Sequence, residues 1–224
     1  MKKITIINGS PRGEQSGSQM FIKEIKKLLK RDELNISDIC IKDKNIKGET
    51  EVAFKEILST DSLLFVFPLY VDCLPSILLD FMEKLEEYVK INKEGHCPKV
   101  YAVVNCGFLE GRQNINAIHI LENFANRIGF KWRFGIGIGA GEFMKSTENN
   151  IPMQSKLKVK IYNALVELAE DIKSDKNEIR SNLLVSPSIP RFLFLFSGNQ
   201  FWVSKAKSNN LSKKQLYERP VGNR

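Results

Sequence analysis

The chain has 224 residues and a formal net charge of +8, a length that fits one α/β domain with an appendage. It contains no uncharged apolar run near the roughly 20 residues of a membrane-spanning helix. Its start shows no signal peptide, so we expect a cytoplasmic protein. Residues 179–224 hold eight Lys or Arg and one acid, which leaves residues 1–178 nearly neutral. The net positive charge of the chain therefore comes almost entirely from residues 179–224.

Short apolar runs alternate with segments of helical period along the first part of the chain. The predicted strands are 3–8, 34–41, 62–67, 99–106 and 131–138. The predicted helices are 18–30, 50–59, 75–91, 114–129 and 155–173. Five successive strand–helix units with right-handed crossovers predict a parallel sheet covered on both faces. Such a doubly wound α/β fold is compatible with strand order 2-1-3-4-5, whose ligands bind at the carboxyl ends of strands 1 and 3.

The loop after the first predicted strand has the features of an anion site. The run Ile4–Ile7 gives way to Gly9, a hydroxyl-rich loop and a helix. Backbone N–H groups converge at a helix N-terminus, and the helix dipole favours negative charge. The spacing of Gly9, Gly13 and Gly17 excludes the Gly-x-Gly-x-x-Gly fingerprint, and no Lys-Ser or Lys-Thr of a Walker loop follows. The alternative is an ordinary βα turn with a serine cap.

Two further loops follow the third and fourth predicted strands. They read Phe67-Pro68-Leu69-Tyr70-Val71-Asp72-Cys73-Leu74-Pro75 and Asn105-Cys106-Gly107-Phe108-Leu109-Glu110-Gly111-Arg112-Gln113. Together with Gly-Ser-Pro-Arg and Ser-x-Ser in the first loop, they resemble the NAD(P)H-dependent FMN reductase family of the flavodoxin-like superfamily. The resemblance covers roughly residues 1–175 and implies a flavodoxin-like five-stranded sheet.

The resemblance implies bound FMN, with NAD(P)H as co-substrate. The implied phosphate-binding residues are Ser10, Arg12, Ser16 and Ser18, and Gln19 is a further implied cofactor-binding residue. The implied neighbours of the flavin ring are Pro68, Leu69, Tyr70, Val71, Asn105, Cys106, Gly107, Phe108 and Glu110. For Cys106 the alternative role is that of a small apolar filler. We expect no catalytic side chain, because hydride transfer to a flavin needs no protein acid or base. Four cysteines without Cys-x-x-Cys spacing give no support for a metal site.

The implied function is an oxidoreductase that passes electrons from NAD(P)H through FMN to a small acceptor, such as a flavin, quinone, nitro or azo compound. The alternative is a non-enzymatic electron carrier like flavodoxin, although the phosphate-loop pattern of flavodoxins is missing. An iron–sulfur flavoprotein is disfavoured, since residues 42–49 lack cysteine. A binding module that lost its flavin is the last alternative. The family also implies a homodimer.

Alternate glycines occupy the segment Gly135–Gly141. Such a pattern allows close approach of the backbone. We expect this segment either to line the flavin site or a subunit contact, or to form a tight bend.

Residues 179–224 form a C-terminal extension with helical character. The segment from Phe192 to Val203 is rich in aromatic side chains, and Lys205, Lys207, Lys213 and Lys214 follow it. Aromatic groups beside lysines can indicate contact with a membrane surface or with nucleic acid. On the sequence we favour a helix that docks on its own domain or on a partner subunit, because exposed apolar side chains are costly. No nucleic-acid partner is expected.

Overall fold

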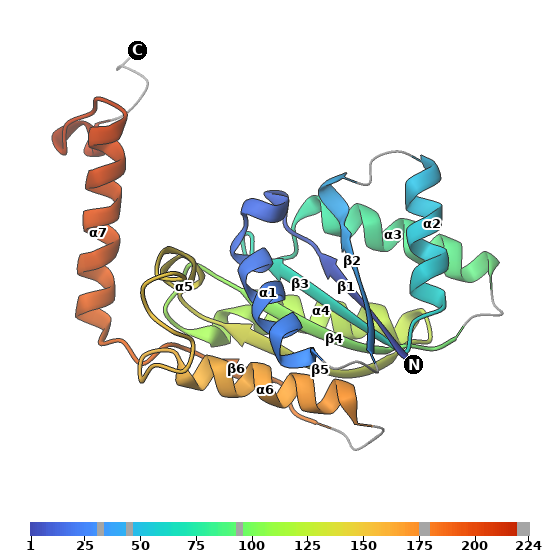
Figure 1. Cartoon of the computed structure of the whole chain (residues 1–224). Coiled ribbons are helices and arrows are strands. Elements are labelled where there is room, and N and C mark those ends of the chain that lie inside the picture. Colours follow the sequence, from blue (N-terminus) through green and yellow to red (C-terminus); the bar gives the residue numbers. More distant parts are fainter. Residues whose placement is uncertain (31–33, 44–46, 93–95, 175–179, 219–224) are drawn as a thin grey trace, which may run out of the picture. The chain divides into compact units, whose positions relative to one another are not determined.

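The computed structural model describes residues 1–30, 34–43, 47–92, 96–174 and 180–218. They form a six-stranded sheet of order β2-β1-β3-β4-β5-β6 with parallel neighbours throughout (Figure 1). The strands are β1 (Lys2–Asn8), β2 (Leu34–Cys40), β3 (Ser62–Pro68), β4 (Lys99–Asn105), β5 (Lys131–Ile138) and β6 (Leu183–Val185). The predicted doubly wound α/β fold and the order of the first five strands are confirmed.

The five predicted helices are present, with ends that lie within four residues of the predicted ones. They are α1 (Gly17–Leu29), α2 (Lys47–Leu58), α3 (Ser76–Ile91), α4 (Ile115–Arg127) and α6 (Val159–Lys173). Two more are α5 (Gly141–Ser146), which was not predicted, and α7 (Arg191–Ser208) in the C-terminal extension. Among the described residues, no helix has the length and apolar character needed to cross a membrane.

The prediction of five strands is wrong, because the sheet has a sixth. Leu183–Val185 pairs in parallel with Ile136–Ile138 of β5. Three residues are too few to show an alternating pattern, so this edge strand left no signal in the sequence. Two compact units make up the chain, Met1–Pro187 and Ser188–Arg224, and β6 lies in the first of them. The sequence analysis assigns the segment of β6 to the extension.

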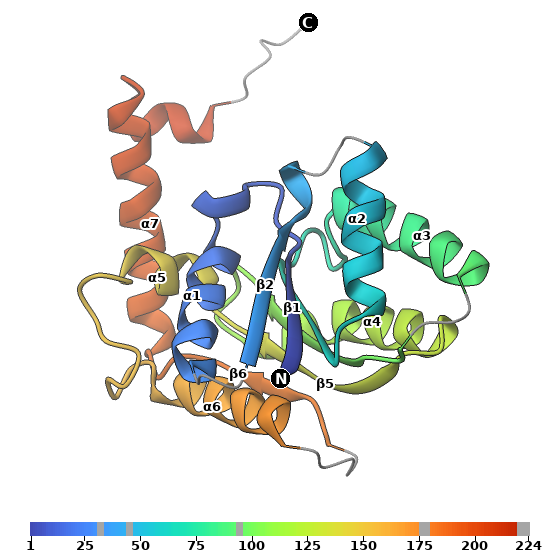
Figure 2. The same ribbon diagram turned by 45° about the vertical axis from the view of Figure 1, so that its right-hand side comes forward.

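Apolar side chains fill both sides of the sheet. On one face the buried cluster joins the strands to α2, α3 and α4, and on the other it joins them to α1, α5 and α6 (Figure 2). Every residue of β3 is buried, as expected for a parallel strand that is covered on both faces. Neighbouring residues serve opposite faces: Ile6 packs into one cluster and Ile7 into the other. The sheet's carboxyl edge is thereby held on a rigid core.

One ionic network lies inside the sheet-bearing unit, around the buried carboxylate of Asp171 on α6. Tyr101 Oη donates to Asp171 Oδ2 over 2.9 Å, and Arg133 Nη2 donates to Oδ1 over 2.9 Å. Arg180 Nε lies 3.1 Å from Asp171 Oδ1. Burial by itself would raise the pKa of Asp171, but the hydrogen bonds from Arg133 and Tyr101 outweigh it and hold the pKa below its ordinary value. The network ties β4, β5 and the segment before β6 to α6.

We predict that Asp171→Asn lowers the free energy of unfolding by about 3–5 kcal/mol, because it leaves a buried arginine without its counter-charge. Urea unfolding at neutral pH measures this. The matched control is Asp80→Asn, whose exposed ion pair with Lys84 is worth at most about 1 kcal/mol. Because the folded pKa of Asp171 is depressed, its contribution is complete at neutral pH and is lost as pH falls below about 4. The variant should therefore lose less stability on acidification than the parent chain; equal losses would contradict this assignment.

Candidate functional site

The loops after β1, β3 and β4 lie at the same edge of the sheet, because these three parallel strands are neighbours. Strand order reverses at β1, with β2 on one side and β3 on the other. In doubly wound folds the crevice beside such a reversal binds ligands. The three loops that bear the predicted site residues are 9–16, 69–75 and 106–110.

Asn8, the last residue of β1, holds the first loop in shape. Its Nδ2 donates to the Gly13 carbonyl over 3.2 Å and to Gln19 Oε1 over 2.9 Å. Its Oδ1 accepts from the Ser10 N–H over 3.1 Å. Gly13 has φ +54°, a conformation that favours glycine. The sequence analysis assigned no role to Asn8; its place directly before Gly9 was the available signal.

The predicted serines of this loop are buried and bonded within it. Ser16 Oγ donates to the Gly13 carbonyl over 2.6 Å and accepts from the Gln19 N–H over 3.1 Å, which caps α1. Ser10 Oγ accepts from the Arg12 N–H over 3.3 Å. These hydroxyl groups therefore set the course of the backbone around the N-terminus of α1.

Arg12 is the exposed cation of the first loop. Its Nη2 lies 2.9 Å from Glu142 Oε1 at the start of α5, and both side chains are more than half exposed. The N–H groups in the first turn of α1 have no acceptor within the helix. An anion at this loop would meet these N–H groups and Arg12, in competition with Glu142. Glu142 is a site neighbour that the sequence analysis did not assign.

Asn105 links the elements that carry the three loops. Its Nδ2 donates to Ser18 Oγ over 3.2 Å and to the Phe67 carbonyl over 3.1 Å. Its own carbonyl accepts from the Leu69 N–H over 2.8 Å. The side chain is buried, so these bonds are shielded from water. One residue at the end of β4 thus connects the N-terminus of α1 to the end of β3.

The loop after β3 contains a strained turn. The backbone groups of Tyr70 and Cys73 bond to each other in both directions, over 2.9 and 3.0 Å. Between them, Val71 has φ 49° and Asp72 has φ 59°, values that are rare for a β-branched residue. The Val71 side chain is 99% exposed, and Tyr70 and Phe108 are also exposed. Backbone strain of this kind is concentrated at functional sites.

The Cys106 thiol points toward the backbone of its own loop. Its Sγ lies 3.7 Å from the Phe108 carbonyl and 3.8 Å from the Glu110 carbonyl, and it accepts from Asn114 Nδ2 over 3.4 Å. Burial raises the pKa of the thiol. These contacts support the role of a small packing group for this side chain.

The glycine segment of β5 packs against the loop after β4. A Cβ at Gly139 would lie 2.0 Å from the Leu109 carbonyl oxygen, and one at Gly141 would lie 2.9 Å from Asn105 Oδ1. The Gly141 N–H also donates to the Cys106 carbonyl over 2.7 Å. Of the two roles expected for Gly135–Gly141, these contacts favour a tightly packed bend, because Gly139 and Gly141 lie against the backbone and side chains of the neighbouring loop.

The structure places every predicted site residue in these three loops or at the strand and helix ends beside them. Pro68 is the buried last residue of β3, and Glu110 is partly buried at the end of the third loop. The contact of any of them with a ligand stays a prediction.

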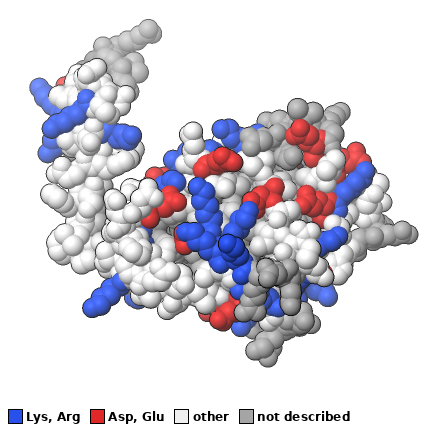
Figure 3. All heavy atoms as spheres, viewed as in Figure 1, with Lys and Arg blue, Asp and Glu red and all other residues white. Residues whose placement is uncertain are grey.

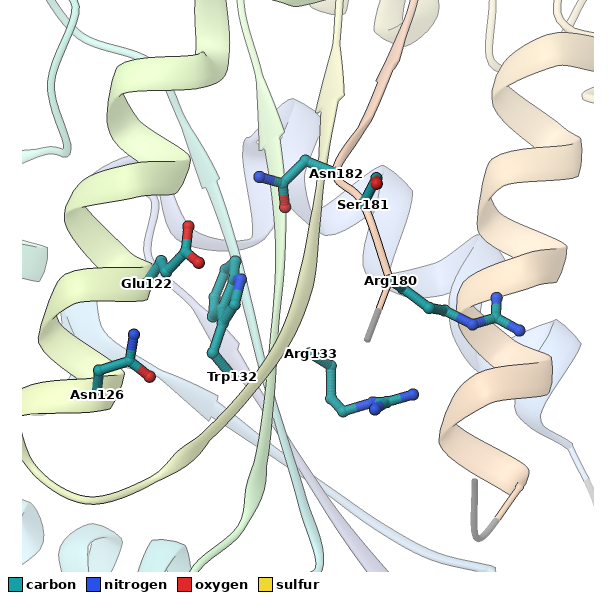
Figure 4. A pocket seen from close by; sticks show the side chains of 7 residues that line it. All are labelled: Glu122, Asn126, Trp132, Arg133, Arg180, Ser181 and Asn182. Atoms are coloured by element: carbon teal, nitrogen blue, oxygen red, sulfur yellow. The ribbon is translucent and has the colours of Figure 1, made fainter. Parts of the chain in front are cut away.

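A separate cavity of about 450 Å³ lies near the amino end of β5 (Figure 4). Its lining residues are Glu122, Asn126, Trp132, Arg133, Arg180, Ser181 and Asn182. The two arginine side chains point away from Glu122 and Trp132 (Figure 4), and both bind Asp171. Their charges are therefore engaged by Asp171, and the three loops at the carboxyl edge of the sheet are the better candidate site.

Comparison with known proteins supports the fold. Residues 2–108 match the model of a family that is described by its flavodoxin-like fold. This match agrees with the flavodoxin-like part of the resemblance over these residues. No curated protein matches the chain.

Several solved structures share the fold. An FMN-dependent NADH-azoreductase from Bacillus anthracis, in complex with FMN, has a TM-score of 0.51 at 16% identity, over 78% of this chain and 100% of its own. An NADPH-quinone reductase from P. pentosaceus has a TM-score of 0.52 at 15% identity, over 79% and 100%. The flavodoxin of Megasphaera elsdenii has a TM-score of 0.50 at 16% identity, over 76% and 99%. At these identities the likeness shows the fold alone.

We predict that Gly139→Ala lowers the free energy of unfolding by about 1–3 kcal/mol, because the new methyl group must displace backbone. The midpoint of urea unfolding measures this loss. The matched control is Gly107→Ala in the neighbouring loop, where a Cβ meets no atom within 4 Å and the change should stay within about 0.5 kcal/mol. Equal effects of the two substitutions would show that the glycine segment is not a packing contact.

Proposed function

We propose that the chain is an FMN-dependent oxidoreductase that passes electrons from NAD(P)H to a small acceptor. The observation that carries this proposal is that Asn105 at the end of β4 bonds to the start of α1 and to the end of β3, beside the reversal of strand order. An anion-binding loop and exposed aromatic side chains meet there, which suits a ligand with a phosphate at one end and a flat ring at the other.

The first loop fits the phosphate of FMN. Arg12 supplies a charge, and the first turn of α1 supplies N–H groups. Ser10 and Ser18 accept hydrogen bonds from within the protein, so each hydroxyl keeps a hydrogen to donate. Ser16 and Gln19 act by holding the loop.

The other two loops fit the flavin ring. Tyr70, Val71 and Phe108 offer exposed apolar surface. Gly107 is exposed, and a Cβ built there would meet open space, so a ligand can approach the backbone closely. Together they supply a partly apolar surface with a polar backbone edge, as the ring requires.

When bound, FMN supplies the electron-transfer chemistry, and the protein supplies binding and orientation. Asn105 holds the loops at fixed separation, and the turn at Val71 presents side chains outward. The Tyr70 hydroxyl is available to bind a substrate. No side chain of the site has to transfer a proton.

A small-molecule acceptor, NAD(P)H as co-substrate and the homodimer stay predictions. An electron carrier is the second candidate function, because the flavodoxin among the similar structures shares the fold. Reduction by a nicotinamide distinguishes the two functions.

We predict that the purified chain binds FMN with perturbed visible bands, and that NADPH or NADH bleaches these bands under anaerobic conditions. Absorption spectra before and after each addition measure this. Bound flavin that neither nicotinamide reduces would support the electron carrier. Absence of flavin binding would overturn the proposed function and leave the fold as described.

We predict opposite effects of the two members of the Arg12–Glu142 ion pair on FMN affinity. Arg12→Ala should weaken binding by roughly tenfold to a hundredfold, as expected for a lost charged hydrogen bond. Glu142→Gln should strengthen it by up to about fivefold, because it frees Arg12 from an exposed ion pair. Fluorescence titration of FMN measures both. The control Glu51→Gln, in an exposed pair with Lys55, should leave the dissociation constant unchanged, and weaker binding by Glu142→Gln would contradict the assignment.

A further inference from the structure

We propose that helix α7 binds the surface of a lipid bilayer that contains anionic headgroups. The helix belongs to the second compact unit of the chain, and the proposal does not depend on the flavin site. Its basis is the distribution of apolar and basic side chains along and around this one helix.

The first part of α7 is apolar on all sides. Residues Phe192 to Phe196 are five consecutive apolar side chains, and successive residues of a helix point about 100° apart. They therefore surround the helix axis. Phe192 is 70% exposed, Phe196 is 61% exposed and Trp202 is 63% exposed. Leu193, Leu195 and Phe201 are exposed as well.

This arrangement favours lipid over a protein partner. A helix that docks on one protein surface needs a single apolar stripe, whereas a helix that is apolar all round requires an apolar environment on every side. Acyl chains provide such an environment. The segment 192–203 holds eight apolar residues in two runs, on either side of Ser197–Gln200. It is too short to cross a bilayer, so an interfacial position fits it.

Basic residues follow the apolar part and define the headgroup side. Lys205 and Lys207 lie in the last turn of α7, and Lys213 and Lys214 follow five and six residues after its end. In this unit, Figure 3 shows blue side chains gathered toward the C-terminal end of the helix and white ones along the rest. Lysines beside a membrane surface are attracted to anionic lipids by about 1 kcal/mol each.

The boundary between the two parts has the character of a membrane interface. Lys205 Nζ lies 5.8 Å from the centroid of the Phe201 ring, and Phe201 packs edge-on against Trp202. Amphipathic aromatic rings and lysine stems are favoured where the acyl region meets the headgroups. The apolar part of α7 would then lie at the acyl boundary, with the lysines among phosphate groups.

The test is flotation of the full chain with vesicles of phosphatidylcholine, with and without phosphatidylglycerol. We expect the chain to float with the anionic vesicles, to float less with phosphatidylcholine alone, and to be released by salt. Brominated lipids should quench its tryptophan fluorescence. Trp202→Phe should abolish that quenching, because Trp132 lies in the sheet-bearing unit.

Substitutions separate the two components of binding. Phe196→Ser should lower vesicle partitioning by roughly tenfold or more. Lys205→Gln and Lys207→Gln should each lower it by about fivefold on anionic vesicles and little on neutral ones. The matched control is Ile91→Ser, which changes an apolar side chain of α3 that is 82% exposed. It should leave partitioning unchanged, and all four variants should bind FMN like the parent chain.

Failure to float with any vesicle would overturn the proposal, as would equal losses with Phe196→Ser and Ile91→Ser. Self-association that depends on protein concentration and is abolished by Phe196→Ser, without vesicle binding, would show that a second copy of the chain covers the helix. Size-exclusion chromatography at several concentrations detects this outcome. Each of these results leaves the proposed flavin site untouched.

Discussion

The site depends on the hydrogen bonds of one buried amide, that of Asn105. Its Nδ2 bonds to Ser18 at the start of α1 and to the Phe67 carbonyl near the end of β3. Gly17 and Gly141 both pack beside its Oδ1, where a Cβ would come within 3.4 and 2.9 Å. Each such bond contributes only about 0.5–1.5 kcal/mol, but together they hold three loops at one separation. A ligand that spans these loops then finds its contacts in place, and little ordering entropy is lost on binding.

The rigidity of this edge also explains how the strained turn persists. A β-branched residue at positive φ costs about 1–3 kcal/mol, and Val71 makes no compensating contact through its exposed side chain. Hydrogen bonds at the base of the turn stabilise it: two backbone bonds join Tyr70 and Cys73, and the Leu69 N–H donates to the Asn105 carbonyl. The protein thereby keeps an unfavourable backbone conformation at the place where apolar surface faces outward. Such a conformation is expected where a site is shaped for a ligand.

Periodicity predicted most of the fold, because strands buried on both faces and helices with one apolar stripe leave strong local signals. The loops of the candidate site were predicted from residue types at strand ends. Contacts between residues far apart in the sequence cannot be predicted from local patterns. Asn105 and Ser18 are 87 residues apart, and Arg12 and Glu142 are 130 apart. Their pairing follows from the order of the strands in the sheet, which brings the ends of β1, β4 and β5 to one edge. The edge strand β6 was missed for a related reason, since three residues become a strand only by pairing with β5.

The extension shows where composition and arrangement lead to different conclusions. Its aromatic content alone favours a covered helix, because exposed apolar surface is costly in water. The positions of the apolar side chains around α7 decide which surroundings can bury them. Phe192 to Phe196 point in every direction around the helix axis. A flat partner would leave some of them in water, whereas a fluid apolar phase would not. The lysines that follow place most of the positive charge of this unit at the C-terminal end of the helix, with Arg191 at the other end. An apolar phase bounded by a negatively charged layer satisfies both requirements at once, and a bilayer with anionic headgroups has this structure.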